Sequence, residues 1–473
     1  MPNRIAFRVA FVCLVHSVFA SSVSAKEILI SPDSDLKTIL KPVVAGDTIV
    51  LANGTWTDTE LKFDSLPGTV KQPIEVRAES PGKVIMTGSV EFRLSGSYVT
   101  VSGLAFRNPS GASDVFALRS HSQRHAHHCR ITDCSFEQTE SSSEKESRWL
   151  NIYGTNNRID HCYFAGKTNR GTTLVVWVAE SVGAHRIDHN HFGHRPKLGK
   201  NGGETLRIGT SDVSELVSRT VVEENYFERC DGEGEIVSNK SCENVYRHNL
   251  FDRCSGALTL RHGHRCTVDG NVFLGKKESG TGGVRIIGRD HRVVNNYFEG
   301  LRGDAERAAI AVMNGIPDSP LNGYSPVKNA LVAHNTFIDC KVSMEFGVRS
   351  SKKVPVVASD SIISHNAFLP GKWELFRVED PPENFTWIGN KHQSGRTRGA
   401  DLVDLQSVDI KLTRAADGLL RPADTKSLAA DEPSKVKTDI DGDTRDSTIA
   451  GCDDPSNSIV DRKLLETTGP SWR

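Results

Sequence analysis

One short stretch of the chain carries the side chains best suited to acid–base and metal chemistry. The segment from Asp231 to Lys240 reads Asp-Gly-Glu-Gly-Glu-Ile-Val-Ser-Asn-Lys and contains two glutamates and a lysine. Arg261 and His262 follow a short distance later in the chain. Carboxylates bind hard cations, while an amine or an imidazole can accept and release a proton. The chemistry to look for is therefore cation binding combined with proton transfer.

The two glutamates, Glu233 and Glu235, are two residues apart, so on a strand they point to the same face. They are expected to point outward, because burying charge without a partner is very costly. A hard cation with oxygen ligands would relieve their repulsion, and Ca²⁺ is the first candidate. Asn201 could add an amide oxygen, and Glu204 a further ligand. The alternative is an ordinary solvated strand face.

The element that must position these residues is a repeat along the middle of the chain. Each unit is an apolar strand followed by Asn, Cys or Gly, one further residue and Phe. Successive phenylalanines are 22 to 39 residues apart, which is typical of solenoids. The units alternate apolar with polar residues and are rich in Val, Ile and Thr, which favours an all-β parallel β-helix over helical repeats. The asparagine is expected at a tight turn, because it tolerates left-handed backbone and can bond to its copies on adjacent coils.

Counting back from each phenylalanine places the reactive residues on coils. Lys240 lies 11 residues before Phe251, and His262 lies 11 before Phe273. Arg261 precedes His262 directly. These residues are therefore expected on neighbouring coils, on the same side of the solenoid.

Arg285 lies 13 residues before Phe298, at nearly the same phase on the next coil, and would extend a basic column. Surface pairing with an acid is the alternative for this arginine. Adjacent strand residues face opposite ways. Arg261 and His262 can therefore both face the site only if a turn intervenes, as Gly263 would allow.

The two ends of the chain differ from the repeat. Residues 1–25 contain Arg4 and Arg8, an apolar run and Val23-Ser24-Ala25, a pattern typical of a secretory signal cleaved near Ala25. The mature protein is then expected to be secreted or periplasmic. Residues 26–394 form the β-helix, and residues 395–473 are interpreted as an irregular C-terminal coil with a loosely attached tail.

The N-terminal end of the solenoid is expected to be capped. The segment from Asp35 to Lys41 has Leu36, Ile39 and Leu40 at helical spacing, which predicts an N-terminal capping helix over the open end. The run from Gly46 to Leu51 is predicted as the first strand.

Composition excludes several classes of function. The formal net charge is −1, so no broad basic field would recruit nucleic acid, and any anionic ligand must be held by local groups. Beyond the signal, no run approaches the roughly 20 apolar residues of a membrane-spanning helix. Of the ten cysteines, nine lie outside the signal, and they are interpreted as buried small hydrophobic residues rather than a disulfide framework.

The reactive residues also carry a family resemblance. The runs Asn201-Gly-Gly-Glu204-Thr-Leu-Arg207, Glu233-x-Glu235-x-x-x-x-Lys240 and Leu260-Arg261-His262-Gly263 resemble the signature of polysaccharide lyase family 6. This family includes alginate lyases and the dermatan-cleaving chondroitinase B. The resemblance covers roughly residues 26–390 and implies a right-handed parallel β-helix.

The resemblance also implies roles for individual residues. Asn201, Glu233 and Glu235 would hold Ca²⁺, with Lys240 as general base and Arg261 as general acid. His262 and Arg285 match substrate-contacting positions of the family, and Arg207, at the end of the first run, is a further candidate for substrate binding. Tyr324, in the loop of residues 314–324, could stack on a sugar ring or be purely structural.

The implied reaction is β-elimination on a uronate polymer. The base removes the C5 proton, which is α to a carboxylate, and the C4 oxygen then leaves. A guanidinium is a poor proton donor, so Arg261 is better suited to hydrogen bonding the leaving oxygen. His262 is the rival acid.

Three functions follow from the sequence and are kept open. A secreted lyase acting on alginate is favoured, with dermatan sulfate as the alternative anionic polysaccharide substrate. A pectin-type hydrolase would need clustered aspartates for acid and base, which the sequence does not offer at this phase. A non-catalytic β-helical carbohydrate-binding protein is the third.

Overall fold

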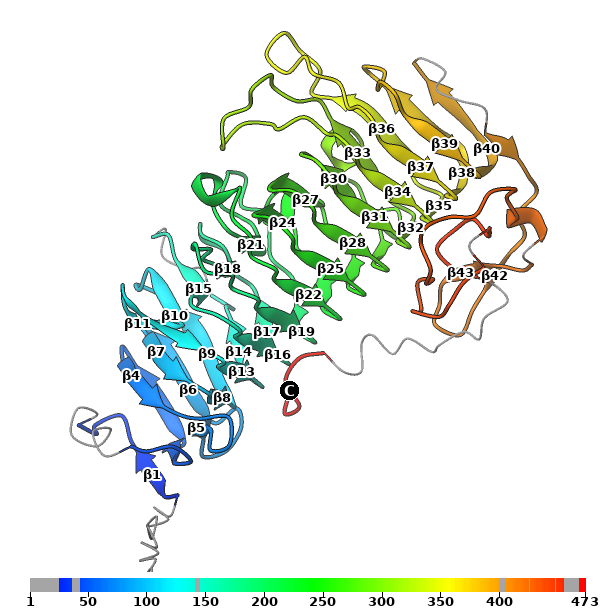
Figure 1. Cartoon of the computed structure of the whole chain (residues 1–473). Coiled ribbons are helices and arrows are strands. Elements are labelled where there is room, and N and C mark those ends of the chain that lie inside the picture. The colour runs from blue at the N-terminus through cyan, green and yellow to red at the C-terminus, as the bar shows by residue number, and fades with distance from the viewer. Residues whose placement is uncertain are drawn as a thin grey trace, which may run out of the picture.

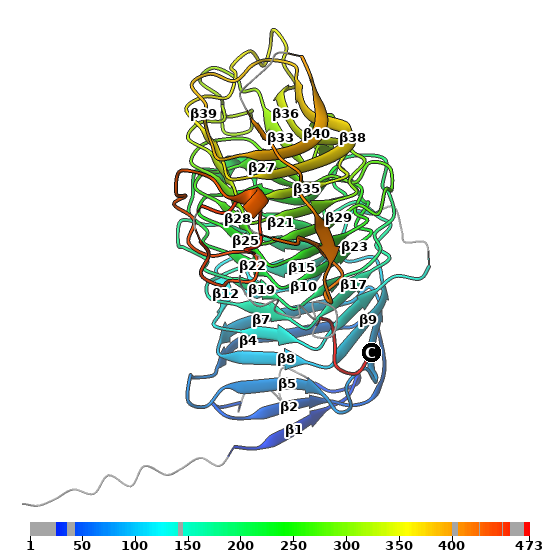
Figure 2. The same ribbon diagram turned by 90° about the vertical axis from the view of Figure 1, so that its right-hand side faces the viewer.

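The structure is a computed structural model that describes residues 25–35, 43–140, 145–399, 405–424, 426–446, 448–454 and 468–473. In these residues nearly all regular structure is strand, and strands of successive coils pair in parallel. The coils stack into one long solenoid (Figure 1), and Figure 2 shows β1, β2, β5 and β8 lying one above another. The predicted all-β parallel β-helix is confirmed. No described helix is long and apolar enough to cross a membrane.

One sheet holds fourteen strands and runs the length of the solenoid. We call it the first sheet. Its strands in order are β1 (Glu27–Ile30), β2 (Thr48–Leu51), β5 (Ile74–Ala78), β8 (Val99–Ser102), β13 (Arg130–Thr132), β16 (Arg158–Asp160), β19 (Arg186–Asp188), β22 (Val221–Glu223), β25 (Val245–Arg247), β28 (Thr267–Asp269), β31 (Arg292–Val294), β34 (Leu331–Ala333), β37 (Ile362–Ser364) and β39 (Thr386–Ile388).

The larger sheet contains two rows of stacked strands. The phenylalanine row comprises β3 (Gly54–Thr57), β6 (Val84–Gly88), β9 (Leu104–Pro109), β14 (Ser135–Glu137), β17 (Tyr163–Ala165), β20 (His191–Phe192), β23 (Tyr226–Glu228), β26 (Leu250–Asp252), β29 (Val272–Leu274), β32 (Tyr297–Glu299) and β35 (Thr336–Ile338), and it ends on β38. The long-strand row comprises β4 (Glu60–Pro67), β7 (Glu91–Ser97), β10 (Asp114–Ala117), β15 (Arg148–Ile152), β18 (Leu174–Val176), β21 (Leu206–Ile208), β24 (Glu235–Lys240), β27 (Ala257–His262), β30 (Val284–Ile286), β33 (Ile310–Met313), β36 (Val342–Val348), β38 (Ala367–Val378) and β40 (Lys391–Arg398).

Short elements complete the fold. They are β11 (Arg119–His121), β12 (Arg124–His127), β41 (Gln406–Ser407), the antiparallel pair β42 (Leu412–Arg414) and β43 (Leu420–Pro422), and the 3₁₀ turns η1 (Ser211–Val213), η2 (Ala305–Arg307) and η3 (Lys426–Leu428).

A ladder of asparagines stacks at the turn between the first sheet and the phenylalanine row. Each side-chain amide donates to the amide oxygen of the next coil at 2.9–3.0 Å. The backbone N–H of each asparagine donates to that same oxygen. The ladder runs through Asn190, Asn225, Asn249, Asn271, Asn296, Asn335, Asn366 and Asn390. The predicted bonding between copies on adjacent coils is confirmed.

The left-handed residue of this turn is not the asparagine but the residue before it. His189, Glu224 and His248 have φ values between 53° and 55°, and the equivalent position is a glycine at Gly270 and Gly389. The asparagine itself is buried, because its amide must satisfy backbone groups that the turn leaves unpaired. The sequence-based reason for the asparagine was therefore half wrong.

The core beside the ladder is a continuous stack of phenylalanine rings. Neighbouring ring centroids from Phe106 to Phe368 lie 4.4–5.1 Å apart. The nine cysteines in the described residues are all buried and free, as expected for small core residues. Because one phenylalanine per coil is fixed in space, it serves as a reliable phase marker.

The N-terminal part of the chain corrects one prediction and leaves two open. The first strand is β1, so the run predicted to be first is the second, β2. Residues 1–24 and 36–42 lie outside the described residues. The predicted signal and the predicted capping helix therefore stay predictions.

The described part of the C-terminal segment packs closely rather than loosely. Leu419, Ile440 and Cys452 form one buried cluster with residues of the phenylalanine row. The buried Arg445 also donates to Asn295 at 3.0 Å. At the end of the chain, Arg473 pairs with Glu137 at 3.3 Å, beside the earlier coils (Figure 1).

Candidate active site

The two strands that carry the predicted centre, β24 and β27, are paired in parallel with one irregularity in each strand. Glu235 pairs with Ala257 and Val237 with Leu258, so Ile236 is an extra residue. Farther along, Asn239 pairs with Leu260 and Lys240 with His262, so Arg261 is extra on the other strand. A β-bulge of this kind re-aims the side chains around it.

The bulge at Ile236 explains how Glu235 and Lys240 come to share one face. They are five residues apart, so strict alternation would turn them to opposite faces. With the extra residue, Ile236 points into the core and is 1% exposed, while Glu235 is half-buried on the outside. Glu233 lies before β24 rather than on it, so the prediction that both glutamates share one strand was wrong in its detail.

The bulge at Arg261 resolves the problem of its orientation. Because Arg261 has no partner on β24, it and His262 both reach the site without the turn predicted at Gly263. The guanidinium of Arg261 donates to the carbonyl of Gly323 at 2.7 Å and stacks 4.2 Å from the ring centroid of Tyr324. The loop of residues 314–324 therefore holds Arg261 in place.

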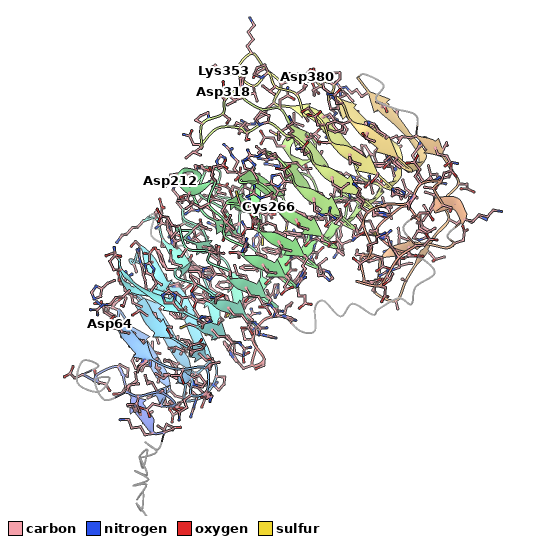
Figure 3. The ribbon with its side chains drawn as sticks, in the orientation of Figure 1. Asp64, Asp212, Cys266, Asp318, Lys353 and Asp380 are labelled. Carbon is pink, nitrogen blue, oxygen red and sulfur yellow. The ribbon has the colours of Figure 1, made fainter. Side chains whose placement is uncertain are left out.

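Two loops meet beside this centre. Asp212 on η1 and Asp318 on the loop of residues 314–324 mark projections on the same side of the solenoid (Figure 3). The hydroxyl of Ser214, just after η1, donates to the carbonyl of Leu321 at 3.4 Å.

His262 is held as a neutral imidazole. Burial, then repulsion from Arg261 and Lys240, lowers the pKa of His262 to about 3. Its Nδ1 lies 3.4 Å from Arg261, which can only donate. Nε2 therefore carries the hydrogen, and it lies 3.1 Å from the hydroxyl of Ser211. The lowered pKa disfavours an imidazolium acid at this position.

Lys240 differs from its neighbours in having no fixed partner. It is half-buried, and its amine makes no hydrogen bond or ion pair with any residue that the structure describes. Two cationic or basic side chains, Arg261 and His262, lie on the neighbouring coil.

Arg285 was expected in line with Lys240 and Arg261, but the structure places it elsewhere. It is in register with Thr259 and, through it, with Ser238, two positions before Lys240. Its guanidinium is 4% exposed and lies 3.5 Å from Glu235 and 3.2 Å from Glu306. Arg285 therefore supports the carboxylates rather than extending the Lys240 column, and its surface-pairing alternative is excluded by its burial.

Glu235 is the best-compensated acid of the site. Its carboxylate accepts from the hydroxyl of Ser238 at 2.6 Å and lies 3.8 Å from Arg261 as well as 3.5 Å from Arg285. Its position is therefore fixed between two cations.

Glu233 carries uncompensated negative charge. Its Oε2 accepts from the backbone N–H groups of Gly202 and Gly203 at 2.8 and 2.9 Å. Burial and then repulsion from Glu204 nevertheless raise the pKa of Glu233 to about 7. One oxygen of Glu204 is buried without any partner.

These observations fit a hard cation at Glu233. No cluster of three or more His, Cys, Asp or Glu side chains suited to a metal occurs in the described ranges. The donor set must then be mixed, with carboxylate, amide and backbone oxygens. The raised pKa of Glu233 and the unpartnered oxygen of Glu204 both indicate that positive charge is needed here. Asn201 is exposed and lines the same cavity.

A cavity of about 340 Å³ opens at the N-terminal ends of these strands. Three metal-ligand candidates, Asn201, Glu233 and Glu235, line it together with Arg285 and Tyr324. The remaining lining residues are Lys197, Gly199, Lys200, Asp231, Gly232, Gly234, Ser255, Glu306, Arg307 and Arg349. The cavity thus combines acidic and basic groups, whereas Lys240 and His262 lie at the far ends of the strands.

Other predicted residues are placed as follows. Arg207 on β21 is half-buried and lies 5.4 Å from the ring centroid of Trp177. His161 and His189 stack at the turn, with ring centroids 5.1 Å apart.

Several site residues were missed by the sequence. Ser238 and Ser211 fix Glu235 and His262, while Glu306 and Arg349 pair with each other beside Arg285. Ser238 lies 13 residues before Phe251, as Arg285 does before Phe298, so the phase count could have found it. Ser211 and Arg349 come from insertions, where no phase applies.

Comparison with known proteins gives consistent matches. The family model of chondroitinase B matches residues 30–369. The alginate lyase AlyGC of polysaccharide lyase family 6 is 35% identical, with a TM-score of 0.81 over 93% of this chain and 59% of that chain. A mannuronic acid specific family 6 lyase from human gut microbiota is 33% identical, with a TM-score of 0.68 over 78% of this chain and 86% of that chain. No curated protein sequence matches significantly.

Fold, site and matches together define a parallel β-helix protein of the polysaccharide lyase type. More specifically, the chain belongs to the chondroitinase B family, which is polysaccharide lyase family 6. It spans about 59% of the length of AlyGC.

Proposed function

We propose that the protein is a polysaccharide lyase that cleaves a uronate polymer by β-elimination. The observation that carries this proposal is the Lys240 amine, which faces the site without a carboxylate partner among the described residues, one coil from Arg261 and His262. A lysine amine in its neutral form can act as a general base. The C5 hydrogen of a uronate is the proton that it would take.

Arg261 is proposed to stabilise the departing C4 oxygen by hydrogen bonding. Its guanidinium is fixed by Gly323 and Tyr324, so its remaining N–H groups are pre-aligned. Because His262 is neutral, we assign it to positioning Arg261 and the substrate, and we assign final protonation of the leaving oxygen to water. The pKa of His262 near 3 supports this assignment.

Glu233 and Asn201 are the proposed main ligands of Ca²⁺, with Glu235 at the margin of the set. The bound cation would neutralise the substrate carboxylate and so make the C5 proton more acidic. Glu235, held between Arg261 and Arg285, links the cation site to the leaving-group side. Arg285 and Tyr324 line the cavity and are proposed to contact the substrate.

Alginate is the proposed substrate. Support comes from the 33–35% identical family 6 enzymes, one an alginate lyase and the other specific for mannuronic acid. The near-neutral net charge of −1 also offers no broad surface for sulfate groups. Dermatan sulfate is the competing substrate.

One assay tests the proposal. The purified protein is incubated with alginate, dermatan sulfate and polygalacturonate, with and without a chelator, and the ultraviolet absorbance of unsaturated uronate ends is followed. Absorbance rising on alginate, and lost on chelation, is expected. Reducing ends without absorbance would indicate hydrolysis, and binding without any cleavage would indicate a non-catalytic carbohydrate-binding protein. Activity that persists after complete chelation would remove Ca²⁺ from the mechanism.

Export is proposed from residues 1–25, with cleavage near Ala25. Mass spectrometry of the protein recovered from an exporting host tests this, and a mature N-terminus far from residue 26 would contradict it.

A further inference from the structure

A half-exposed tryptophan lies two coils before Lys240 on the long-strand row. Trp177 directly follows β18, and its N–H donates to the carbonyl of Ile152 at 2.9 Å, so it continues the strand. Inward and outward residues alternate, with Val176 in the core and Trp177 outside. The side chain belongs to none of the buried apolar clusters. Core packing therefore does not account for a tryptophan at this position.

The indole ring is held in one orientation. Its Nε1 donates to the buried side chain of Asn151 at 3.0 Å. On the preceding coil, the ring of Tyr153 stacks against it with centroids 5.8 Å apart and an angle of 8° between the planes. Arg119 covers Tyr153 in turn, at 4.0 Å. A large half-exposed side chain fixed in this way is pre-organised, as ligand-contacting aromatics are.

The coil between Trp177 and Lys240 carries a glycine, Gly209, at the position in line with both. Since Tyr153 comes from the preceding coil, the second face is turned to the following coil, that of Gly209. A Cβ on Gly209 would lie 2.5 Å from the carbonyl oxygen of Lys240, and its φ of +81° disfavours other residues. Neighbouring coils are about 4.8 Å apart, so the backbones of Trp177 and Lys240 are roughly 10 Å apart, with Gly209 in line between them. The Arg207 guanidinium lies beside this position, 5.4 Å from the indole centroid.

The charge beside Gly209 is an arginine that forms no ion pair with any described residue. This residue, Arg207, lies on the coil of Gly209, and its Nε is buried without a partner. Arg148 also lies near the indole, at 5.6 Å, but it is paired with Glu146 at 2.8 Å.

We propose that Trp177 and Arg207 form a binding subsite for one uronate ring of the substrate chain, next to the ring from which Lys240 takes the proton. The apolar C–H face of a pyranose would stack on the indole, as aromatic faces accept apolar surface. Its carboxylate would pair with Arg207. This inference rests on the proposed function, because it places the ring relative to Lys240.

Such a subsite sets a dependence on chain length. A substrate that is too short to reach Trp177 gains nothing from it, whereas a longer chain does. The competing explanation, in which Trp177 only seals the surface of β15 and β18, predicts no such dependence.

The test measures binding in the Lys240→Ala background, so that no substrate is turned over. Affinity for saturated mannuronate and guluronate hexasaccharides and disaccharides is measured by calorimetry, with and without Trp177→Ala. The hexasaccharides are expected to bind about five- to tenfold more weakly with Trp177→Ala, and the disaccharides equally well. Arg207→Gln is expected to show the same pattern.

The matched control is Trp373→Ala. Trp373 on β38 is also half-buried, donates to Asp339 at 2.9 Å and has Arg302 4.9 Å from its ring, but it lies five coils from Lys240. Trp177→Phe keeps an aromatic ring and should restore most of the binding if the alanine variant is poorly folded. Equal hexasaccharide affinity in the Trp177 and Trp373 variants would overturn the subsite.

The outcomes for the two proposals are separable. If the wild-type protein forms no unsaturated ends, the lyase proposal fails, and the length-dependent binding still decides the subsite. If the wild type cleaves alginate while Trp177→Ala binds every chain length as the control does, the subsite alone fails.

Discussion

The asparagine turn and the long-strand row belong to the same coils but follow opposite rules. At the turn, one residue type recurs from Asn190 to Asn390, and each copy before the last donates to the next one. In the long-strand row, the outward column that contains Ser238 has Arg207 before it and Thr259 after it. Bulges interrupt this row at the site and leave the ladder untouched. Regularity thus maintains the scaffold, and departures from it create the chemistry.

The largest expected effect comes from a residue of the long-strand row, where the bulges lie. Lys240→Ala should lower kcat on alginate by about a thousandfold, since general base catalysis contributes roughly 10²–10⁴. The melting temperature should not change, because the amine has no hydrogen bond within the described structure. Initial rates of absorbance increase and a thermal melt measure both. Full turnover by this variant would overturn the assignment of the base.

A substitution in the asparagine ladder should show the reverse: a loss of stability with little change in kcat. Asn249→Ala removes the acceptor of the backbone and side-chain N–H groups of Asn225, at 3.1 and 3.0 Å, and leaves the Val222 carbonyl without its donor. Buried groups left unpaired cost about 3 kcal/mol in total. Denaturant unfolding should show this loss, with kcat of the folded protein nearly unchanged.

Asn329→Ala is the control for the ladder variant. Its side chain makes one exposed bond to Asp290 at 3.2 Å, and its φ of 52° costs an alanine about 1 kcal/mol, so clearly less stability should be lost than with Asn249→Ala. If both variants unfolded at the same denaturant concentration, the ladder would not be the scaffold described above.

A conservative change at the bulge tests its geometry. Arg261→Lys keeps the charge but loses the planar group that binds Gly323 and stacks on Tyr324, so kcat should fall about thirtyfold with little change in KM. Arg265→Lys, whose partner Glu243 lies on the outer surface at 3.2 Å, serves as the control. A similar fall in both variants would mean that the loss is not specific to the site.

The smallest expected effect concerns the buried position just before each strand of the first sheet, which His291 occupies on its coil. His291 is fully buried, and burial lowers its pKa to about 4. The unfolded chain, with a pKa near 6.5, then binds more protons between these values, so stability falls as pH drops through that window. The loss from this group between about pH 7 and pH 5.5 is on the order of 1 kcal/mol.

His291→Asn should flatten this pH dependence. Asn157 and Asn244 already occupy the equivalent position on other coils and accept the same kind of backbone N–H, at 2.9 Å in both cases. Unfolding free energies at several pH values, compared with the wild type, measure the slope. An unchanged slope would mean that His291 does not titrate in this range.

The same contrast explains what the sequence could predict. Phe251 and Phe273 recur because each coil needs one core ring, so counting from them placed Lys240 opposite His262 correctly. A bulge leaves no such trace, since Ile236 and Arg261 look like ordinary strand residues. Their effect on direction appears only when two coils are paired.

Long insertions were also beyond the reach of phase counting. Tyr324 was named as a loop residue, but its stacking on Arg261 depends on a loop whose path no repeat dictates. Ser211 reaches His262 from another insertion in the same way. Residues that touch the centre from outside the coils therefore require the structure.

The asparagine ladder has a consequence for how such a protein can change in length. Each interior asparagine donates to the coil after it and accepts from the coil before it, so every interior step is chemically identical. A whole coil could be duplicated or lost between Asn271 and Asn296 without leaving an amide unpaired. The ladder has no built-in length. Its chemistry allows the solenoid to grow by gene duplication while the site stays on the coils that carry it.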